Sequence, residues 1–220
     1  MFEDDVANHE MTIAERDPVN RQLKFKTKDS MTYSFEITTW SNHLCISGDM
    51  GTYVFKRSHD MFKFFRGPIN EFYWAEKVIS NDIYSPAMAY SNEAFIDLVN
   101  ERLAEHIACR DEEDHKYDDE LIESVNAEII SIDQRDDIEA RDTAVNFTFR
   151  GKRIFHDFGE SILNRPTRRF SWCCKAISWA IDKYDRREII TLDMLALKPD
   201  HLDIENSNPQ SSEGTLHAEA

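Results

Sequence analysis

The chain has 220 residues, of which 41% are hydrophobic and 11% aromatic. This apolar content excludes an intrinsically disordered chain and is enough for one compact body. With 42 Asp and Glu against 26 Lys and Arg, the formal charge is -16, which disfavours non-specific binding to nucleic acid or to anionic membranes and favours a basic partner surface.

The N-terminus and the cysteines bear on the cellular compartment. The first ten residues, MFEDDVANHE, lack the basic and apolar stretches of a signal peptide, and no apolar run reaches the length of a membrane span. Cys173 and Cys174 are adjacent, and neighbouring residues on a helix rarely bridge each other. We therefore expect a cytoplasmic protein with reduced thiols, including Cys45 and Cys109, with at least one of the adjacent pair buried.

Residues 23 to 57 alternate apolar and polar side chains, which predicts four antiparallel strands: LKFKTK, YSFEITTW, HLCISGDM and TYVFKR. The candidate core positions are Phe25, Phe35, Ile37, Leu44, Ile46, Tyr53 and Phe55. Between the last two strands lies Gly48-Asp49-Met50-Gly51. A strand follows this segment instead of the helix that a phosphate-binding loop needs. The segment is therefore interpreted as a hairpin turn, with positive φ at the glycines and a local hydrogen bond from Asp49.

From residue 59 onwards, the apolar residues recur at the spacing of a helix. Short helical stripes occupy HDMFKFFRG and EFYWAEKVIS, and a longer helix is predicted over residues 91 to 110 with Ser91 as its N-cap. A further helix is predicted over residues 118 to 132, and after a break a helical segment is predicted over residues 134 to 144. A central helix is predicted over residues 170 to 187. The inward positions expected for residues 118 to 132 are Leu121, Ile122, Val125, Ile129 and Ile130.

These patterns predict a single α+β domain, residues 1 to 200. In it, an N-terminal four-stranded antiparallel meander (residues 20 to 57) packs against a helical body (residues 59 to 198). The composition beyond Pro199 turns to Asn, Ser, Glu and Gly, which predicts a flexible tail over residues 201 to 220.

The sequence shows no motif for metal, cofactor or nucleophilic chemistry. None of the eight His has the spacing of a structural zinc site, and no HExxH, GxSxG or Walker motif occurs. We expect no cofactor. The alternative is a metal-dependent nuclease or other hydrolase whose site is assembled from dispersed residues: His43, His59, His106, His156, Asp49 and Asp157. Base stacking by Trp40, Phe72, Tyr73 and Trp74 is a further alternative, but their mixed neighbouring charges favour core packing.

The runs TYSFEITTWSNHLCISGDMGTYVFKR, DMFKFFRG and FSWCCKAISWAIDKYD resemble a family of small proteins encoded by tailed phages and prophages. The resemblance covers roughly residues 20 to 187. It implies a phage accessory protein in the cytoplasm of the host cell. Host takeover, or counter-defence of the anti-CRISPR type, is the usual role of such products.

Charge is distributed unevenly. Residues 111 to 146 hold fourteen Asp or Glu against three Lys or Arg, whereas residues 147 to 187 hold ten Lys or Arg against four Asp or Glu. If the acidic segment is mainly helical, it spans about 50 Å and spaces its carboxylates much like the phosphates of one nucleic-acid strand, about 3.4 Å apart.

This layout predicts a DNA-mimicking surface that binds and inhibits a host protein with a basic surface, without direct binding to nucleic acid. Solvated acidic residues without any partner are the open alternative. The candidate partner-binding residues are Asp111, Glu112, Glu113, Asp114, Asp118, Asp119, Glu120 and Glu123.

Overall fold

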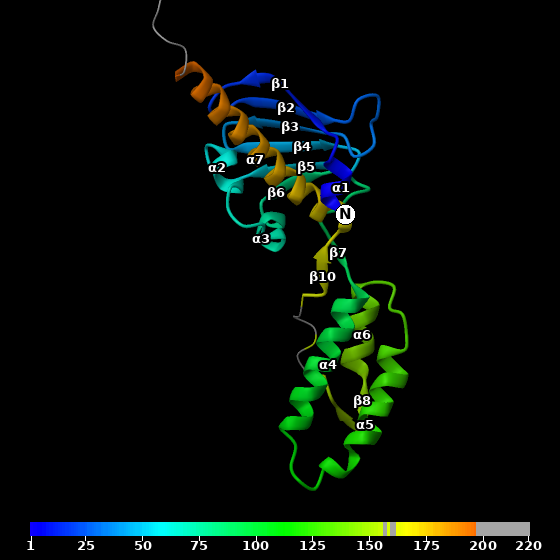
Figure 1. Ribbon diagram of the computed structural model, residues 1–220. Coiled ribbons are helices and arrows are strands. Elements are labelled where there is room, and N and C mark those ends of the chain that lie inside the picture. The colour runs from blue at the N-terminus through cyan, green and yellow to red at the C-terminus, as the bar shows by residue number, and fades with distance from the viewer. Residues whose placement is uncertain (156–157, 159–161, 197–220) are drawn as a thin grey trace, which may run out of the picture. The chain divides into compact units, whose positions relative to one another are not determined.

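The computed structural model describes residues 1–155, 158 and 162–196 (Figure 1). The chain divides into two compact units, residues 1–183 and 184–220. The predicted domain limit at residue 200 and the predicted tail, residues 201–220, lie outside the described residues. Within the described part of the chain, no helix combines the length and apolar character needed to cross a membrane.

The N-terminal half forms a six-stranded antiparallel sheet in the order β1-β2-β3-β4-β5-β6. Its strands are β1 (Glu10–Arg16), β2 (Arg21–Lys26), β3 (Phe35–Trp40), β4 (His43–Gly48), β5 (Gly51–Lys56) and β6 (Val78–Asn81). The protein is thus α+β as predicted, but the predicted number of four strands, now β2 to β5, was wrong. The pattern missed β1 because its two larger apolar residues, Met11 and Ile13, are only half-buried. It missed β6 because VISN follows a helical stripe.

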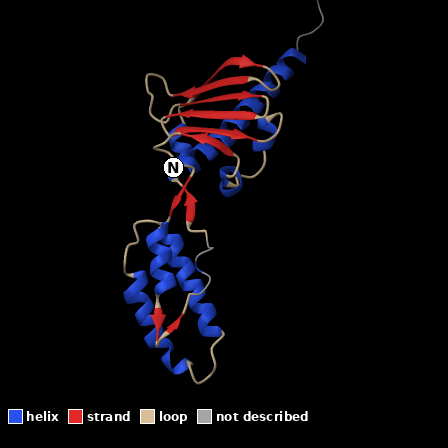
Figure 2. Ribbon diagram, turned by 180° about the vertical axis from the view of Figure 1, so that it is seen from behind, coloured by secondary structure: helices blue, strands red, loops and turns tan. Residues whose placement is uncertain are grey.

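One face of the sheet is buried beneath residues 168–183 of helix α7 (Arg168–Ala196), which lie across the strands in Figure 1. Ring centroids of Phe170 and Tyr53 are 5.1 Å apart, and those of Trp179 and Phe25 are 5.5 Å apart. The predicted central helix is therefore confirmed. Figure 2 shows the opposite face of the sheet, where the strands lie in front of α7. All seven predicted core positions of the strands are buried: Phe25, Phe35, Ile37, Leu44, Ile46, Tyr53 and Phe55.

Three short helices pack at the margins of this sheet: α1 (Phe2–Val6), α2 (Met61–Phe65) and α3 (Glu71–Ala75). The indole Nε1 of Trp172 donates to Asp5 Oδ2 at 2.9 Å, which ties α1 to α7. Ring centroids of Phe65 and Trp74 are 4.6 Å apart, which joins α2 to α3. The helical stripe predicted through residue 80 ends at Ala75, and the chain continues as β6.

The turn between β4 and β5 is a hairpin, as predicted, because Gly48 pairs with Gly51 and no helix begins there. Gly51 has a φ of 107°, but Gly48 does not adopt positive φ. Gly48 is needed because a Cβ there would lie 2.2 Å from the carbonyl oxygen of Ser34. The predicted local bond of Asp49 was also wrong, since its Oδ2 accepts from the N–H of Tyr33 at 2.9 Å.

Between β7 (Met88–Tyr90) and β10 (Asn164–Pro166), which pair with each other, the chain forms a helical insertion, residues 91–163. Its elements are α4 (Asn92–Ala108), the 3₁₀ turn η1 (His115–Tyr117), α5 (Asp118–Val125), the π turn η2 (Asn126–Ile130), α6 (Asp137–Asn146), β8 (Thr148–Phe149) and β9 (Lys152–Arg153). Ser91 Oγ accepts from the N–H of Ala94 at 3.1 Å, so the predicted N-cap is confirmed.

The helical insertion has its own hydrophobic core cluster. Ile129 is buried in it as predicted, whereas Ile122 is 38% exposed because its neighbour Leu121 takes the inward position on α5. Ile130 is only half-buried. The buried members are Phe95, Val99, Leu103, Leu121, Val125, Ile129, Ala140, Ala144, Phe147, Phe149, Ile154, Phe155, Phe158 and Leu163.

Candidate functional site

The acidic segment does not form one long helix. The helix α5 and the turn η2 together cover residues 118–130, about 20 Å of axis, and residues 131–136 then separate them from α6. The predicted helix over residues 118 to 132 and the further helical segment after a break are confirmed, and the break means that the carboxylates do not follow one axis of about 50 Å. The eight predicted partner-binding residues lie in the segment after α4 and on α5, within thirteen consecutive residues.

Six of these eight carboxylates are exposed, and one of the six, Glu120, is paired with Arg150, which leaves five. Asp119 and Glu123 lie one turn apart on α5, so they share a face of that helix. Among the described residues, no side-chain hydrogen bond or ion pair involves any of the five carboxylates. We call them the free acidic surface: Asp111, Glu112, Glu113, Asp119 and Glu123.

The other three carboxylates face basic partners or a cavity. Asp118 Oδ1 lies 2.7 Å from Arg110 Nη1, and its Oδ2 lies 2.8 Å from His115 Nδ1. Glu120 Oε2 lies 2.7 Å from Arg150 Nη2, and this contact raises the pKa of Arg150 above its ordinary value. Asp114 is half-buried in a cavity wall. The structure thus divides the predicted surface into five free and three engaged carboxylates.

The cavity that Asp114 lines has a volume of about 230 Å³ and lies between α4, η1 and the β8–β9 hairpin. A second hollow of about 240 Å³ shares His106 and Ile154 with it. Sequence reasoning missed this cavity because its cations are dispersed over more than forty positions. We call it the cationic cavity, and its lining residues are His106, Arg110, Asp114, Tyr117, Phe149, Arg150, Lys152 and Ile154.

The dispersed residues of the alternative enzyme site are not gathered by the described structure. His43 and His59 lie at one end of the sheet, where His59 Nδ1 is 3.0 Å from Ser41 Oγ. Asp49 follows the other end of β4, and His106 lies on α4. Over residues 1–155, 158 and 162–196, no group of three or more His, Cys, Asp or Glu could hold a metal ion. His156 and Asp157 lie outside the described residues.

Three of the four aromatic candidates reach solvent. Trp74 is 2% exposed, which confirms core packing for this residue, but Phe72 is 49% exposed and Tyr73 is 37% exposed. Trp40 is 39% exposed and stacks on His43, with ring centroids 5.0 Å apart. The prediction of core packing was therefore wrong for Trp40, Phe72 and Tyr73.

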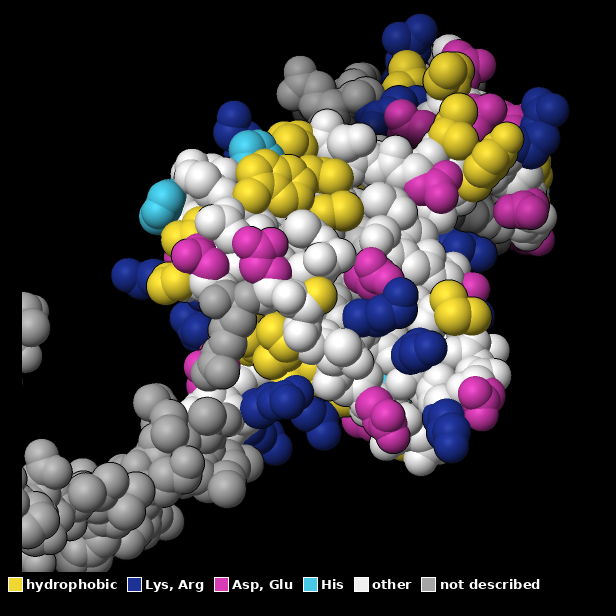
Figure 3. All heavy atoms as spheres, turned by 90° about the horizontal axis from the view of Figure 1, so that it is seen from above, with side chains coloured by type: hydrophobic (Ala, Val, Ile, Leu, Met, Phe, Trp, Pro, Cys, Tyr) yellow, Lys and Arg dark blue, Asp and Glu magenta, His cyan; other side chains and the backbone are white. Residues whose placement is uncertain are grey.

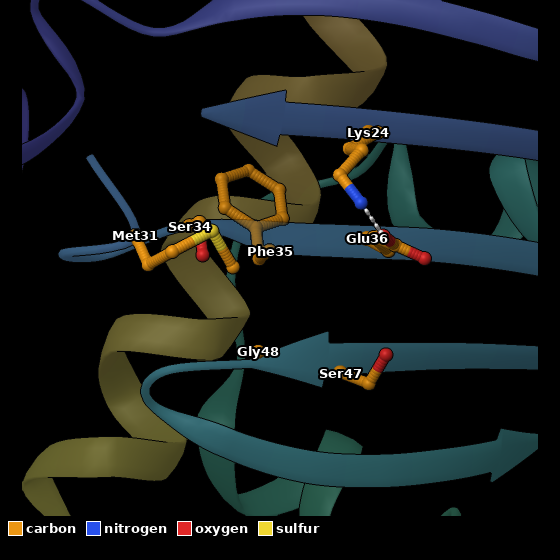
Figure 4. A pocket seen from close by; sticks show the side chains of 7 residues that line it. All are labelled: Lys24, Met31, Ser34, Phe35, Glu36, Ser47 and Gly48. Atoms are coloured by element: carbon orange, nitrogen blue, oxygen red, sulfur yellow. Dashed lines mark hydrogen bonds and ion pairs between the residues drawn. The ribbon is translucent and has the colours of Figure 1, made fainter. Parts of the chain in front are cut away.

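The sheet carries another cavity, of about 260 Å³, beside the β4–β5 hairpin (Figure 4). Its two charged residues, Lys24 and Glu36, form an ion pair with each other. The charges in this cavity are therefore balanced. Figure 3 likewise shows acidic and basic side chains interspersed over most of the face that it displays.

All four cysteines are free, as predicted. Cys173 and Cys174 are buried in α7, and burial raises the pKa of the Cys173 thiol from 9.0 to about 12. Burial also raises the pKa of Cys174. Burial and a raised pKa both suppress the reactive thiolate, as is typical of cysteines that pack in a core. Cys109, at the end of α4, is exposed.

No family model, curated protein or solved structure matches the chain. The resemblance to tailed-phage proteins therefore stays a prediction. What the geometry offers is a group of unpaired carboxylates on the helical insertion and a cationic cavity beside it. The first can bind a basic macromolecular surface, and the second can bind a small anion.

Proposed function

We propose that the chain is a non-enzymatic accessory protein that binds and inhibits a host protein through its free acidic surface. The observation that carries this proposal is the exposure of Asp111, Glu112, Glu113, Asp119 and Glu123, to which the described residues offer no basic partner. Carboxylates that have no cationic partner repel each other in the free protein. A basic partner surface relieves this repulsion on binding.

The location of the charge supports the same role. The helical insertion holds 20 Asp or Glu against 8 Lys or Arg, a net charge of -12 out of -16 for the whole chain. A field of this size attracts a basic partner before contact and raises the association rate, by an amount that decreases with added salt. The helical insertion is therefore the part of the chain proposed to reach the partner first.

The proposed partner is a nucleic-acid-binding protein of the host, because such a protein already presents Lys and Arg to phosphates. Carboxylates of the segment after α4 and of α5 would occupy phosphate positions over a short stretch. Resemblance to phage accessory proteins supports a component of a defence system as the target. The mimicry is thus proposed for a compact surface and not for an extended helix.

Affinity capture from infected host cells tests the proposal. A variant with Asp111→Asn, Glu112→Gln, Glu113→Gln, Asp119→Asn and Glu123→Gln is expected to capture no partner while its fold stays intact and its thermal midpoint does not fall. Capture by the unmodified chain is expected to weaken steeply as salt rises.

A matched control removes the same number of exposed carboxylates from outside the helical insertion. It carries five substitutions: Glu3→Gln, Glu10→Gln, Glu15→Gln, Asp29→Asn and Asp182→Asn. We expect this control to capture the partner as the unmodified chain does. Equal capture by both variants, or equal loss in both, would contradict the assignment of the free acidic surface.

A further inference from the structure

The lining of the cationic cavity is richer in cations than the helical insertion around it, although Asp118 and Glu120 pair with two of these cations from outside the lining. Its wall holds three permanent cations, Arg110, Arg150 and Lys152, against the single carboxylate of Asp114. The helical insertion that contains it has a net charge of -12. A concave site with this sign of charge, inside so acidic a segment, is suited to an anion that the surrounding surface would repel.

The backbone at Arg150 supplies a second and independent observation. Arg150 and Gly151 form a two-residue hairpin turn between β8 and β9, with φ of 51° and 76°. Turns with positive φ at both central residues favour Asn-Gly, because a Cβ at positive φ crowds the carbonyl oxygen and Asn offsets this cost by hydrogen-bonding locally. Arg150 therefore occupies a position where the local backbone disfavours it, and such strain is concentrated at ligand sites.

The side chain of Arg150 is held in place despite this strain. Its guanidinium carbon lies 3.5 Å from the ring centroid of Tyr117, and its Nη2 lies 2.7 Å from Glu120 Oε2. Arg110 is oriented in the same way by Asp118, at 2.7 Å from its Nη1. Carboxylates that orient two guanidinium groups leave other N–H donors on each group to bind a ligand.

Lys152 completes the cationic wall. Its side chain is exposed, and within the described part of the chain no ion pair or hydrogen bond involves its ammonium group. The rings of Tyr117 and Phe149 and the side chain of Ile154 form the apolar part of the lining. The lining thus combines cations with aromatic and aliphatic surface, as sites for small organic anions do.

We propose that the cationic cavity binds a small phosphorylated molecule of mononucleotide size. The phosphate would lie against Lys152, Arg110 and Arg150, and the organic part would lie against Phe149 and Ile154. The adjoining hollow of about 240 Å³ extends the volume beyond what inorganic phosphate alone fills. This site goes beyond the proposed function and does not depend on it, because it uses none of the residues of the free acidic surface.

Calorimetric titration of the full chain with adenosine monophosphate, and separately with inorganic phosphate, tests the proposal. We expect saturable binding of the nucleotide and weaker binding of phosphate. Lys152→Gln is expected to weaken nucleotide binding about tenfold, the effect of losing one charge-assisted hydrogen bond. Lys152→Arg is expected to restore most of the affinity, which separates loss of charge from loss of fold.

Arg153→Gln is the matched control. Arg153 is the next residue on β9, is exposed and does not line the cavity, so its removal changes the net charge equally. We expect Arg153→Gln to change the affinity less than twofold. Backbone amide shifts in NMR spectra of the bound chain should centre on Tyr117 and Lys152.

Three outcomes would overturn the proposal. The first is no saturable nucleotide binding at millimolar concentration. The second is an equal loss of affinity in Lys152→Gln and Arg153→Gln, which would show a diffuse field instead of a site. The third is phosphate binding as tight as nucleotide binding, which would remove the role of the apolar wall and leave a site for inorganic phosphate alone.

Discussion

The sheet region, residues 1–90 and 164–183, and the helical insertion, residues 91–163, differ sharply in charge. The sheet region holds 14 Asp or Glu against 15 Lys or Arg, whereas the helical insertion holds 20 against 8. The overall charge of -16 is therefore mainly a property of one segment. A whole-chain charge indicates what the protein repels, but only the location of that charge indicates which surface attracts a partner.

Each region contains a more buried and a more exposed ion pair, and two pairs, one from each region, show what burial changes. In the sheet region, Arg21 is 5% exposed, its Nη1 lies 3.0 Å from Asp60 Oδ1, and its guanidinium carbon lies 4.4 Å from the centroid of the Phe62 ring. In the helical insertion, the pair of Arg150 and Glu120 is about half exposed. Removing one partner of a buried ion pair lowers the free energy of unfolding strongly, because water does not solvate the remaining charge. Removing one partner of a surface pair has little effect, because water solvates the remaining charge.

The largest expected effect is that of Asp60→Ala. This change removes the Asp60 carboxylate beside the buried Arg21 and removes the N-cap of α2, where Asp60 Oδ1 accepts from the N–H of Phe62 at 3.1 Å. We expect the free energy of unfolding to fall by about 3–5 kcal/mol in urea denaturation. Glu123→Ala in the helical insertion is the control, with an expected change within about 0.5 kcal/mol. Similar losses in both variants would remove the distinction between the regions.

Glycine substitutions compare turn packing in the two regions. Gly48→Ala places a Cβ 2.2 Å from the carbonyl oxygen of Ser34, so the backbone must shift, and we expect a loss of about 3 kcal/mol. Gly151→Ala has no atom within 4 Å but has a φ of 76°, and we expect a loss of about 1 kcal/mol. Thermal unfolding would measure both. A larger loss of stability for Gly151→Ala than for Gly48→Ala would show that the positive φ of Gly151 matters more than the close contact of Gly48 with Ser34.

Alkaline pH should destabilise the sheet region through its buried thiols. The folded pKa of Cys173 is raised from 9.0 to about 12, so the unfolded chain loses this proton first. Its contribution to stability is complete below pH 9 and is lost between pH 9 and 12, at about 1.4 kcal/mol per pH unit. Urea denaturation at pH 8 and pH 10 should show a smaller decrease for Cys173→Ala than for the unmodified chain. Identical decreases would argue against burial of this thiol.

The smallest expected effect is that of the fivefold variant of the free acidic surface. Removing mutual repulsion among exposed carboxylates should raise the thermal midpoint by about 2 °C at low salt. The difference should vanish at high salt because the repulsion is then screened. Scanning calorimetry at two salt concentrations would measure it. A lowered midpoint would mean that these carboxylates stabilise the fold and are not a free surface.

The strands β2 to β5 could be predicted because each places two large apolar side chains two residues apart, on the face that is buried. A strand that is buried on one face requires this period. Strand β1 was not predicted because it is an edge strand in which Met11 and Ile13 are only half-buried, so apolar and polar side chains alternate only weakly along it. Ile122 was misplaced because an apolar residue beside Leu121 is not distinguished from a core residue by hydropathy alone.

For the candidate site, the acidic residues were predictable as a set, since charge runs are visible in the sequence. Which of them are free was not, because Glu120 is paired by Arg150, thirty positions away. The cationic cavity was equally hidden: Arg110 and Lys152 are forty-two positions apart. The signal that could have indicated it is Arg150-Gly151, a turn dipeptide with Arg where Asn is favoured.

The sequence by itself determined the α+β class, the core face of the central strands, the N-cap of α4 and the uneven distribution of charge. These follow from local periodicity, composition and capping chemistry, which depend on residues a few positions apart. Only the tertiary structure decided that the sheet has six strands, that Arg21 is buried beside Asp60, and that five of eight carboxylates are free. Each of these depends on which distant residues come into contact, and contact over long sequence separation has no local signature.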